Sequence, residues 1–246
     1  MAREDGADDE GAGETPARKT EKKIMSIIEQ LSALKKEIPS GVKLVLVSKF
    51  QSEETIMEAY NAGHRIFAEN YPQEFEKKVK SLPEDIEWHF IGHLQSNKIK
   101  MVVPYASLIH SVDSEKLLYE IDDYCQKNGL KTKVLLEIHV AREETKQGFT
   151  MDEAEELLEK LRKEPLKCVT LCGIMGMATL TDDNIEIQRE FTLLYSFYSR
   201  MKQRHLQWPE FKELSMGMSE DYKYAVRLGS TILRIGTKVF GKREKL

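Results

Sequence analysis

The sequence predicts a single (β/α)8 TIM barrel, an α/β fold, and three observations support this prediction. Eight short apolar runs suited to strands alternate with amphipathic stretches of helical period. Strict alternation of strands and helices is typical of a parallel sheet. The chain has 246 residues, close to the roughly 250 of a typical barrel. A doubly wound open sheet shares the alternation, but only a closed barrel places the first strand beside the last.

The elements are predicted in order from the spacing of apolar residues. The strand-like runs cover residues 44–47, 65–67, 87–91, 108–111, 134–138, 169–174, 213–215 and 232–235. Helical spacing occurs between them, over residues 53–61, 72–81, 97–103, 114–128, 152–164, 184–206 and 220–228. Ser52, followed by two glutamates, is typical of a helix start.

The N-terminal part of the chain divides into two predicted segments. Residues 1–20 are rich in Asp, Glu, Gly and Ala and have almost nothing apolar to bury, which predicts a disordered acidic extension. Residues 21–36 carry apolar side chains at helical spacing, which predicts an amphipathic helix that covers part of the barrel. The barrel domain is therefore expected to span residues 21–246.

Composition excludes several classes of function. The chain has 37 Lys and Arg against 41 Asp and Glu, so no basic excess suggests a nucleic-acid partner. No apolar run approaches the roughly 18 residues of a membrane span. Three cysteines are too few and too irregularly spaced for a disulfide framework, so we expect a reducing, cytoplasmic location. The residues between Cys168 and Cys172 belong to a predicted strand, and no metal site is expected.

Two motifs near the C-terminal end predict a phosphate-binding site. Residues 214–219 (Leu-Ser-Met-Gly-Met-Ser) follow the seventh predicted strand, and residues 233–237 (Leu-Arg-Ile-Gly-Thr) end the eighth. Small and hydroxyl-bearing residues at strand ends leave backbone N–H groups available to an anion, which the start of a helix also favours. The phosphate sites of TIM barrels commonly lie in the loops after these two strands.

Lys49 lies at the end of the first predicted strand and is a candidate Schiff-base former. Taken alone, a lysine at a strand end is usually a solvated residue. In a closed barrel, however, Lys49 would face the predicted phosphate site across the neighbouring eighth strand. His89, also in a predicted strand, is expected to be a hydrogen-bonded core histidine rather than a base.

Seven motifs follow in order along the chain, each at a predicted strand end or in the loop after it. They are residues 47–49, 67–71, 88–98, 146–148, 173–177, 214–219, and 234–237 with 240–241. Together they closely resemble the pyridoxal phosphate (PLP) homeostasis proteins, single-domain relatives of the barrel domain of alanine racemase. The resemblance implies the TIM barrel already predicted and PLP as the cofactor.

The resemblance also implies a role for each of eight cofactor-binding residues. Lys49 would form the internal aldimine with PLP, which requires an amine that is nucleophilic near neutral pH. Arg234 would contact the pyridine nitrogen. Because a guanidinium only donates hydrogen bonds, this nitrogen would be unprotonated, and PLP would be a poorer electron sink than in enzymes that place an Asp there. Asn70 would contact the ring or its 3-hydroxyl. The phosphate would be held by Ser215, Met218, Ser219, Gly236 and Thr237.

The function implied is that of a PLP-binding protein in vitamin B6 homeostasis. Such a protein holds PLP reversibly and influences its supply to PLP-dependent apoenzymes, without robust catalysis of its own. The chain is expected to be a monomer with no catalytic residue. Lys146, after the fifth predicted strand, is either an ordinary solvated lysine or a residue at the mouth of the site that handles PLP on its way in or out.

Two alternatives remain open from the residues. The first is a PLP-dependent amino-acid racemase, which needs a second base opposite the lysine. In alanine racemases this base is a tyrosine from the partner's extra C-terminal domain, and the present chain ends at Leu246, a few residues beyond the eighth predicted strand. The second is a barrel that binds another phosphorylated metabolite, which would leave Lys49 without a chemical role.

Overall fold

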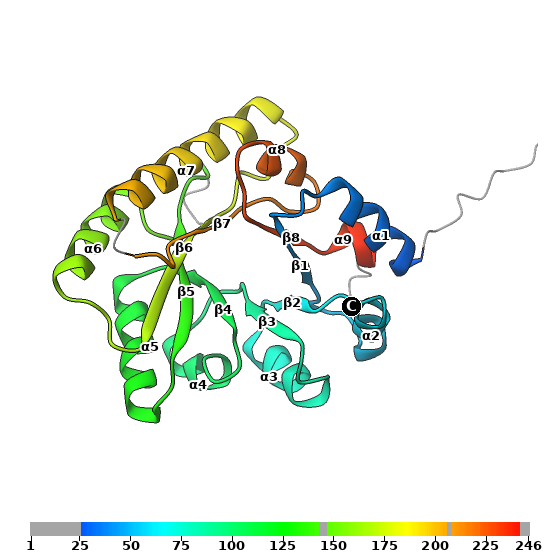
Figure 1. The fold of residues 1–246 in the computed structure, drawn as a ribbon, viewed down its shortest axis with the longest axis horizontal. Coiled ribbons are helices and arrows are strands. Elements are labelled where there is room, and N and C mark those ends of the chain that lie inside the picture. Colours follow the sequence, from blue (N-terminus) through cyan, green and yellow to red (C-terminus); the bar gives the residue numbers. More distant parts are fainter. Residues whose placement is uncertain (1–25, 143–146, 206–207, 242–246) are drawn as a thin grey trace, which may run out of the picture.

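The computed structural model describes residues 26–142, 147–205 and 208–241, and these residues form a closed barrel of parallel strands. The strands follow one another around the barrel in chain order, and the first pairs with the last (Figure 1). They are β1 (Lys43–Val47), β2 (Ile66–Glu69), β3 (Glu87–Phe90), β4 (Leu108–Val112), β5 (Thr132–Ile138), β6 (Val169–Gly176), β7 (Glu213–Ser215) and β8 (Ile232–Ile235). The predicted fold class is confirmed.

Helices surround the barrel and connect successive strands (Figure 1). The longer ones are α1 (Ile27–Glu37), α2 (Glu53–Asn61), α3 (Pro72–Ser81), α5 (Glu115–Asn128), α6 (Met151–Lys163) and α7 (Asn184–Arg204). The shorter ones are the 3-10 turn η1 (Ser96–Lys98), α4 (Ile99–Val102), α8 (Tyr222–Arg227) and α9 (Thr237–Phe240).

Three helical segments differ from the sequence prediction. The stretch predicted over 97–103 is a 3-10 turn followed by the four residues of α4, and α8 is shorter than its predicted range. The predicted N-terminal helix begins only at Ile27, because Ser26 accepts a hydrogen bond from Glu29 N–H in a capping box. Residues 21–25 and the predicted extension over 1–20 lie outside the described residues. No periodic pattern predicted α9.

The register of the strands decides which side chains enter the barrel. Neighbouring side chains on parallel strands face the same side of the sheet. Val45 and Ala68 belong to the apolar cluster inside the barrel, and they pair with Arg234 and His89 respectively. Both polar residues therefore point into the interior. A second, larger apolar cluster fills the layer between strands and helices.

Gly92, just beyond β3, permits close contact between the ends of β3 and β2. A Cβ atom at this position would lie 1.9 Å from the backbone oxygen of Asn70, which no side chain can accommodate. The absence of a side chain at Gly92 therefore allows the chain to pass directly against Asn70, the residue that follows β2.

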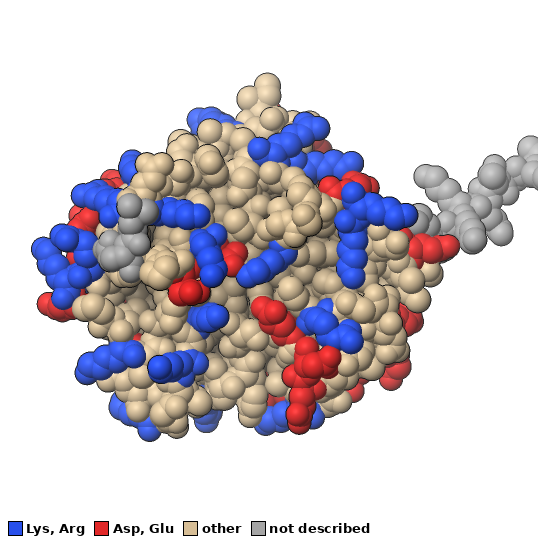
Figure 2. Space-filling model, viewed as in Figure 1, with Lys and Arg blue, Asp and Glu red and all other residues tan. Residues whose placement is uncertain are grey.

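The surface carries both signs of charge. Lys and Arg side chains are intermixed with Asp and Glu over the face seen in Figure 2. This mixture agrees with the formal net charge of −4. Within the described segments, no helix is both long enough and apolar enough to cross a membrane.

Candidate functional site

A cavity of about 300 Å³ opens at the carboxyl ends of the strands. Its walls come from the ends of β1, β2 and β8 and from the loops after β6 and β7. Seven of the eight predicted cofactor-binding residues line it: Lys49, Asn70, Met218, Ser219, Arg234, Gly236 and Thr237. The closure of β1 against β8 brings together residues that are far apart in the sequence.

One end of the cavity is formed by backbone amides around Ser219. The Ser219 hydroxyl oxygen accepts hydrogen bonds from the N–H groups of Gly236 and Lys238, each at 3.3 Å. Two amide donors from the start of α9 thus converge on one oxygen atom. This is a donor set suited to the oxygen of an anion.

The Met218 amide has a hydrogen-bond partner within the protein. Its N–H donates to Asp221 Oδ1 at 2.5 Å, and Asp221 is itself buried. Sequence reasoning missed Asp221, which lines the cavity two residues after Ser219. A contact between the Met218 N–H and a phosphate would have to replace this carboxylate, and the phosphate role of Met218 stays a prediction.

Arg234, in the middle of β8, is a buried cation on the cavity wall. Its Nη1 donates to Ser215 Oγ at 2.6 Å, and its Nη2 donates to the Gly176 carbonyl at 3.1 Å. Burial lowers the pKa of Arg234 to about 10, although the carboxylates of Asp221 and Glu137 act in the opposite direction. The guanidinium is therefore still charged near neutral pH and is held by partners on β6 and β7.

Ser215 is the predicted site residue that does not line the cavity. Its side chain is fully buried inside the barrel, and its hydroxyl contacts Arg234 on one side and His110 Nδ1, at 2.9 Å, on the other. Ser215 thus contacts the guanidinium of Arg234 without lining the cavity. Direct phosphate binding by Ser215 stays a prediction, while its contact with Arg234 is a structural fact.

A chain of hydrogen bonds continues from Ser215 through the barrel. His110 Nε2 and His89 Nδ1 are 2.9 Å apart, and His89 Nε2 lies 3.0 Å from Glu87 Oε1. Burial lowers the pKa of His110 well below its ordinary value, so His110 is neutral. We call Ser215, His110, His89 and Glu87 the histidine chain. His89 is the bonded core histidine that the sequence predicted.

Arg234, which contacts Ser215, and Glu87, at the other end of the histidine chain, are both charged. These two charges determine the direction of the hydrogen bonds in the chain. Arg234 only donates, so Ser215 accepts from it and donates onward to His110 Nδ1. His110 then carries its proton on Nε2 and donates to His89, which donates to the Glu87 carboxylate. The bond from His89 lowers the pKa of Glu87, in agreement with an ionised acceptor.

Asn70, which directly follows β2, also lines the cavity. Its Oδ1 is buried and has no hydrogen-bond partner among the described residues. A buried amide oxygen without a partner is costly, and a ligand that donates a hydrogen bond would relieve this cost.

Two further predictions concern other parts of the chain. Lys146 lies outside the described residues. Cys168 and Cys172 are free thiols, and the described residues contain no group of three or more His, Cys, Asp or Glu side chains arranged to hold a metal ion. Burial raises the pKa of Cys172 to about 11, so this thiol is not poised as a nucleophile.

Comparison with known proteins first defines the class. The family profile described as alanine racemase, N-terminal domain, matches residues 24–244, nearly all of the barrel. Alanine racemase from Clostridium difficile has the same fold, with a TM-score of 0.74 at 15% identity over 89% of this chain and 57% of that one. The protein is thus a barrel of the alanine racemase N-terminal type.

Closer relatives define the family within this class. The pyridoxal phosphate homeostasis protein of Schizosaccharomyces pombe is 38% identical over 82% of this chain and 85% of its own. That of Pasteurella multocida is 36% identical over 83% and 88%. The structure of PipY from Synechococcus elongatus with PLP bound has a TM-score of 0.80 at 36% identity, covering 88% of this chain and 100% of that one. The chain belongs to the family of pyridoxal phosphate homeostasis proteins.

Proposed function

We propose that this protein binds pyridoxal 5′-phosphate covalently and reversibly through Lys49 and acts in the homeostasis and supply of PLP. The observation that carries the proposal is the cavity in which Lys49, Arg234 and the amides around Ser219 meet. The names of the relatives and the PLP complex of PipY support the same ligand.

The residues present fit PLP at three separate points. The N–H groups of Gly236 and Lys238 converge on the Ser219 hydroxyl oxygen, and a phosphate oxygen can replace that oxygen as their acceptor. The unpartnered Asn70 Oδ1 can accept a hydrogen bond from a ring hydroxyl. Arg234 supplies a charged donor for a ring nitrogen.

PLP, when bound, supplies an aldehyde that condenses reversibly with a primary amine and releases water. Lys49 is the amine at the cavity, and it must lose a proton before it reacts. Arg234 holds its proton throughout, because its pKa of about 10 leaves the guanidinium charged at neutral pH. A donor that stays protonated favours an unprotonated ring nitrogen and so weakens carbanion chemistry.

The composition of the cavity wall supports binding without robust turnover. Among the described residues that line it there is no tyrosine, histidine or cysteine. Two carboxylates line it, Glu220 and Asp221, and Asp221 is engaged by the Met218 amide. A racemase needs a second base opposite its lysine, so we propose a storage and supply role rather than racemisation.

We further propose that the protein transfers PLP to apoenzymes. We also propose that it is a monomer and lies in the cytoplasm. The lack of a disulfide framework in the sequence supports the cytoplasmic location. Sedimentation of the full chain with and without PLP tests the monomer. Incubation of the PLP-loaded chain with an apo-aminotransferase tests transfer, with release of activity as the signal.

The covalent part of the proposal is tested by titrating the full chain with PLP and recording its absorbance near the violet edge of the visible range. Wild type should develop a band that borohydride removes, and Lys49→Ala should not, although weak PLP retention through the phosphate end remains. A Lys49→Ala variant with the same reducible band would contradict the role of Lys49. Wild type with phosphate affinity but no such band would favour a barrel for another phosphorylated metabolite.

Racemisation is tested separately, with PLP-loaded protein and L-alanine in deuterium oxide. We expect exchange of the α-proton no faster than with free PLP at the same concentration. Exchange well above that level, abolished by Lys49→Ala, would instead support the racemase.

A further inference from the structure

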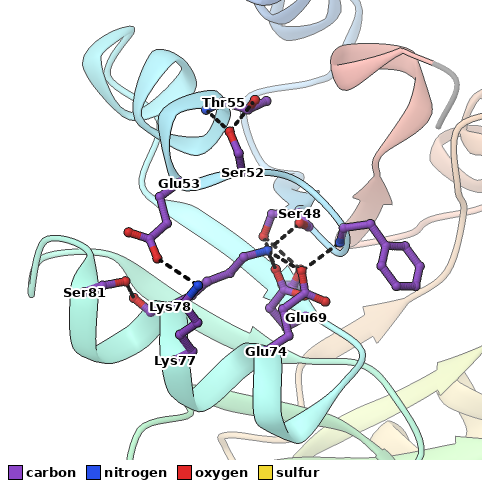
Figure 3. Close-up of polar contacts among 11 residues, drawn as sticks. Ser48, Ser52, Glu53, Thr55, Glu69, Glu74, Lys77, Lys78 and Ser81 are labelled. Atoms are coloured by element: carbon purple, nitrogen blue, oxygen red, sulfur yellow. Dashed lines mark hydrogen bonds and ion pairs between the residues drawn. The ribbon is translucent and has the colours of Figure 1, made fainter. Parts of the chain in front are cut away.

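Lys78, on α3, is a lysine buried against the barrel wall, with only 4% of its surface exposed. Its Nζ donates hydrogen bonds to Glu74 Oε1 at 2.6 Å, to Glu69 Oε1 at 2.7 Å and to the Ser48 carbonyl at 2.8 Å. Figure 3 shows these acceptors gathered around the end of the lysine side chain. An ammonium has three donors, and here each has a partner. We call Lys78, Glu69 and Glu74 the Lys78 clamp.

The Lys78 clamp holds the residues on both sides of Lys49. Ser48 precedes Lys49, and besides its carbonyl bond to the clamp its hydroxyl donates to Glu69 Oε1 at 2.7 Å. Phe50 follows Lys49, and its N–H donates to Glu74 Oε1 at 2.8 Å. The cavity-lining lysine therefore lies between two residues that one buried charged cluster ties to β2 and α3.

Phe50 has an unusual backbone conformation that its own side chain does not explain. Its φ is 62°, the only positive value among the described non-glycine residues. Left-handed backbone is unfavourable for a bulky residue unless the surroundings impose it. The ring is 56% exposed and touches Tyr71 at 5.1 Å between centroids, so packing around it is limited. The hydrogen bond to Glu74 is a direct constraint on this turn.

The two glutamates of the Lys78 clamp differ in burial, so the cost of replacing them differs. Glu69 is fully buried, accepts both of its hydrogen bonds on Oε1, and has no partner for Oε2 among the described residues. Burial accordingly raises the pKa of Glu69. Glu74 is partly exposed and bridges Lys78 to the Phe50 amide, so it can be changed without creating an unpaired fully buried charge.

We propose that the Lys78 clamp positions Lys49, because it fixes the peptide groups on both sides of that residue and holds Phe50 in the left-handed conformation. Lys78, Glu69 and Glu74 are positioning residues: they act on the backbone from which the Lys49 amine enters the cavity. The inference rests on the proposed function of Lys49, and its test includes a measurement on the protein without PLP.

The chain offers a matched control on the same helix. Glu74 and Lys78 form an i,i+4 pair at 2.6 Å, and Glu76 and Lys80 form another at 2.7 Å, which is exposed. Glu74→Leu removes the acceptor for the Phe50 N–H, whereas Glu76→Leu removes an equivalent carboxylate away from Lys49. Glu74→Gln keeps an acceptor oxygen and removes only the charge.

The first readout is hydrogen–deuterium exchange of the Phe50 amide in PLP-free protein, and the second is the rate of PLP release from loaded protein into excess apo-acceptor. We expect Glu74→Leu to accelerate both by about tenfold, the effect of one lost hydrogen bond to a charged group. Glu74→Gln should stay within about threefold of wild type. Glu76→Leu should match wild type in both.

A rescue experiment separates positioning from general stability. Glycine adopts positive φ without a penalty, so Phe50→Gly added to Glu74→Leu should recover part of the lost PLP retention. Equal release rates for Glu74→Leu and wild type would overturn the inference, and so would equal effects of Glu74→Leu and Glu76→Leu or the absence of rescue. If wild type itself takes up no PLP, the proposed function fails, and the exchange of the Phe50 amide alone decides whether the clamp fixes this backbone.

Discussion

Two buried polar networks reach the cavity from different sides, and they are built on different principles. The Lys78 clamp behind Lys49 is ionic and acts on the backbone. The histidine chain behind Arg234 consists of neutral groups between two charged ends, and it acts on a side chain. Different networks therefore support the two cationic residues of the cavity, Lys49 and Arg234.

The difference has an energetic consequence. In the Lys78 clamp, removal of Lys78 or Glu69 leaves a buried charge without its partner, and such losses are large. In the histidine chain, removal of a neutral member costs one or two hydrogen bonds, and such losses are modest. We therefore expect the Lys49 side to control folding and the Arg234 side to control ligand affinity and the response to acid.

The largest expected effect is that of Lys78→Met on folding. It leaves the buried Glu69 carboxylate without its cation, so the free energy of unfolding should fall by about 3–5 kcal/mol. Denaturant unfolding of wild type and variant measures this. Lys80→Met is the control, because its pair with Glu76 is exposed, and it should leave the free energy nearly unchanged. A small, equal effect of both substitutions would mean that the clamp contributes no more than a surface pair.

The next effect is that of Arg234→Gln on PLP affinity. Loss of a charged donor to the ring should weaken binding by about 1.5–3 kcal/mol, while the borohydride-sensitive band still forms. Titration of variant and wild type with PLP measures the difference. Unchanged affinity, or a PLP complex in which Arg234 contacts the phosphate instead of the ring, would refute the assigned role.

Acid should affect the two networks differently, and His110 gives the clearest signal. The pKa of His110 in the folded protein lies well below the roughly 6.5 of an unfolded histidine. The unfolded state therefore binds a proton that the folded state does not, and stability falls as the pH drops below about 6.5. The unfolded-state pKa limits this contribution to at most about 2 kcal/mol at pH 5.

The comparison of wild type with His110→Gln isolates that contribution. His64 also lowers the stability of the folded protein in acid, because burial lowers its pKa to about 4. This contribution is the same in both proteins and cancels in the comparison. Free energies of unfolding at pH 7 and pH 5 should therefore show a smaller drop for the variant. An identical drop in both proteins would mean that His110 is protonated in the folded state at pH 5.

The smallest expected effect is spectroscopic. The chain of donors from Arg234 to Glu87 assigns the proton of both His110 and His89 to Nε2. Long-range nitrogen–proton correlation spectra of histidine-labelled protein report these tautomers directly. A proton on Nδ1 of His110 would reverse the hydrogen bond to Ser215 and contradict the proposed direction of the histidine chain.

Much of the fold could be predicted from the sequence, because each strand is a short apolar run and each long helix has helical period. The elements that were not predicted have physical reasons. α9 has only four residues, too few for a periodic pattern, and Ser26 starts α1 later than apolar spacing alone suggests. Within the site, the positions of Lys49, Asn70 and Arg234 follow from strand ends and barrel closure.

The supporting networks could not be predicted in the same way. Lys78 stands among other lysines on a polar-looking helix, and only its spacing of three from Phe75 and four from Glu74 hinted at the buried face. Asp221 accepts a local hydrogen bond whose geometry depends on the turn after β7. The contact between His110 and Ser215 joins residues 105 positions apart, which only the closed barrel brings together.

The central claim, that Lys49 holds PLP, is tested most directly by reducing the PLP-loaded full chain with borohydride and mapping the modified residue by mass spectrometry. The account predicts one phosphopyridoxyl group on the peptide that contains Lys49, and none at this position in Lys49→Ala. A stable group on a different lysine in wild type, or a loaded protein with no reducible adduct, would contradict it.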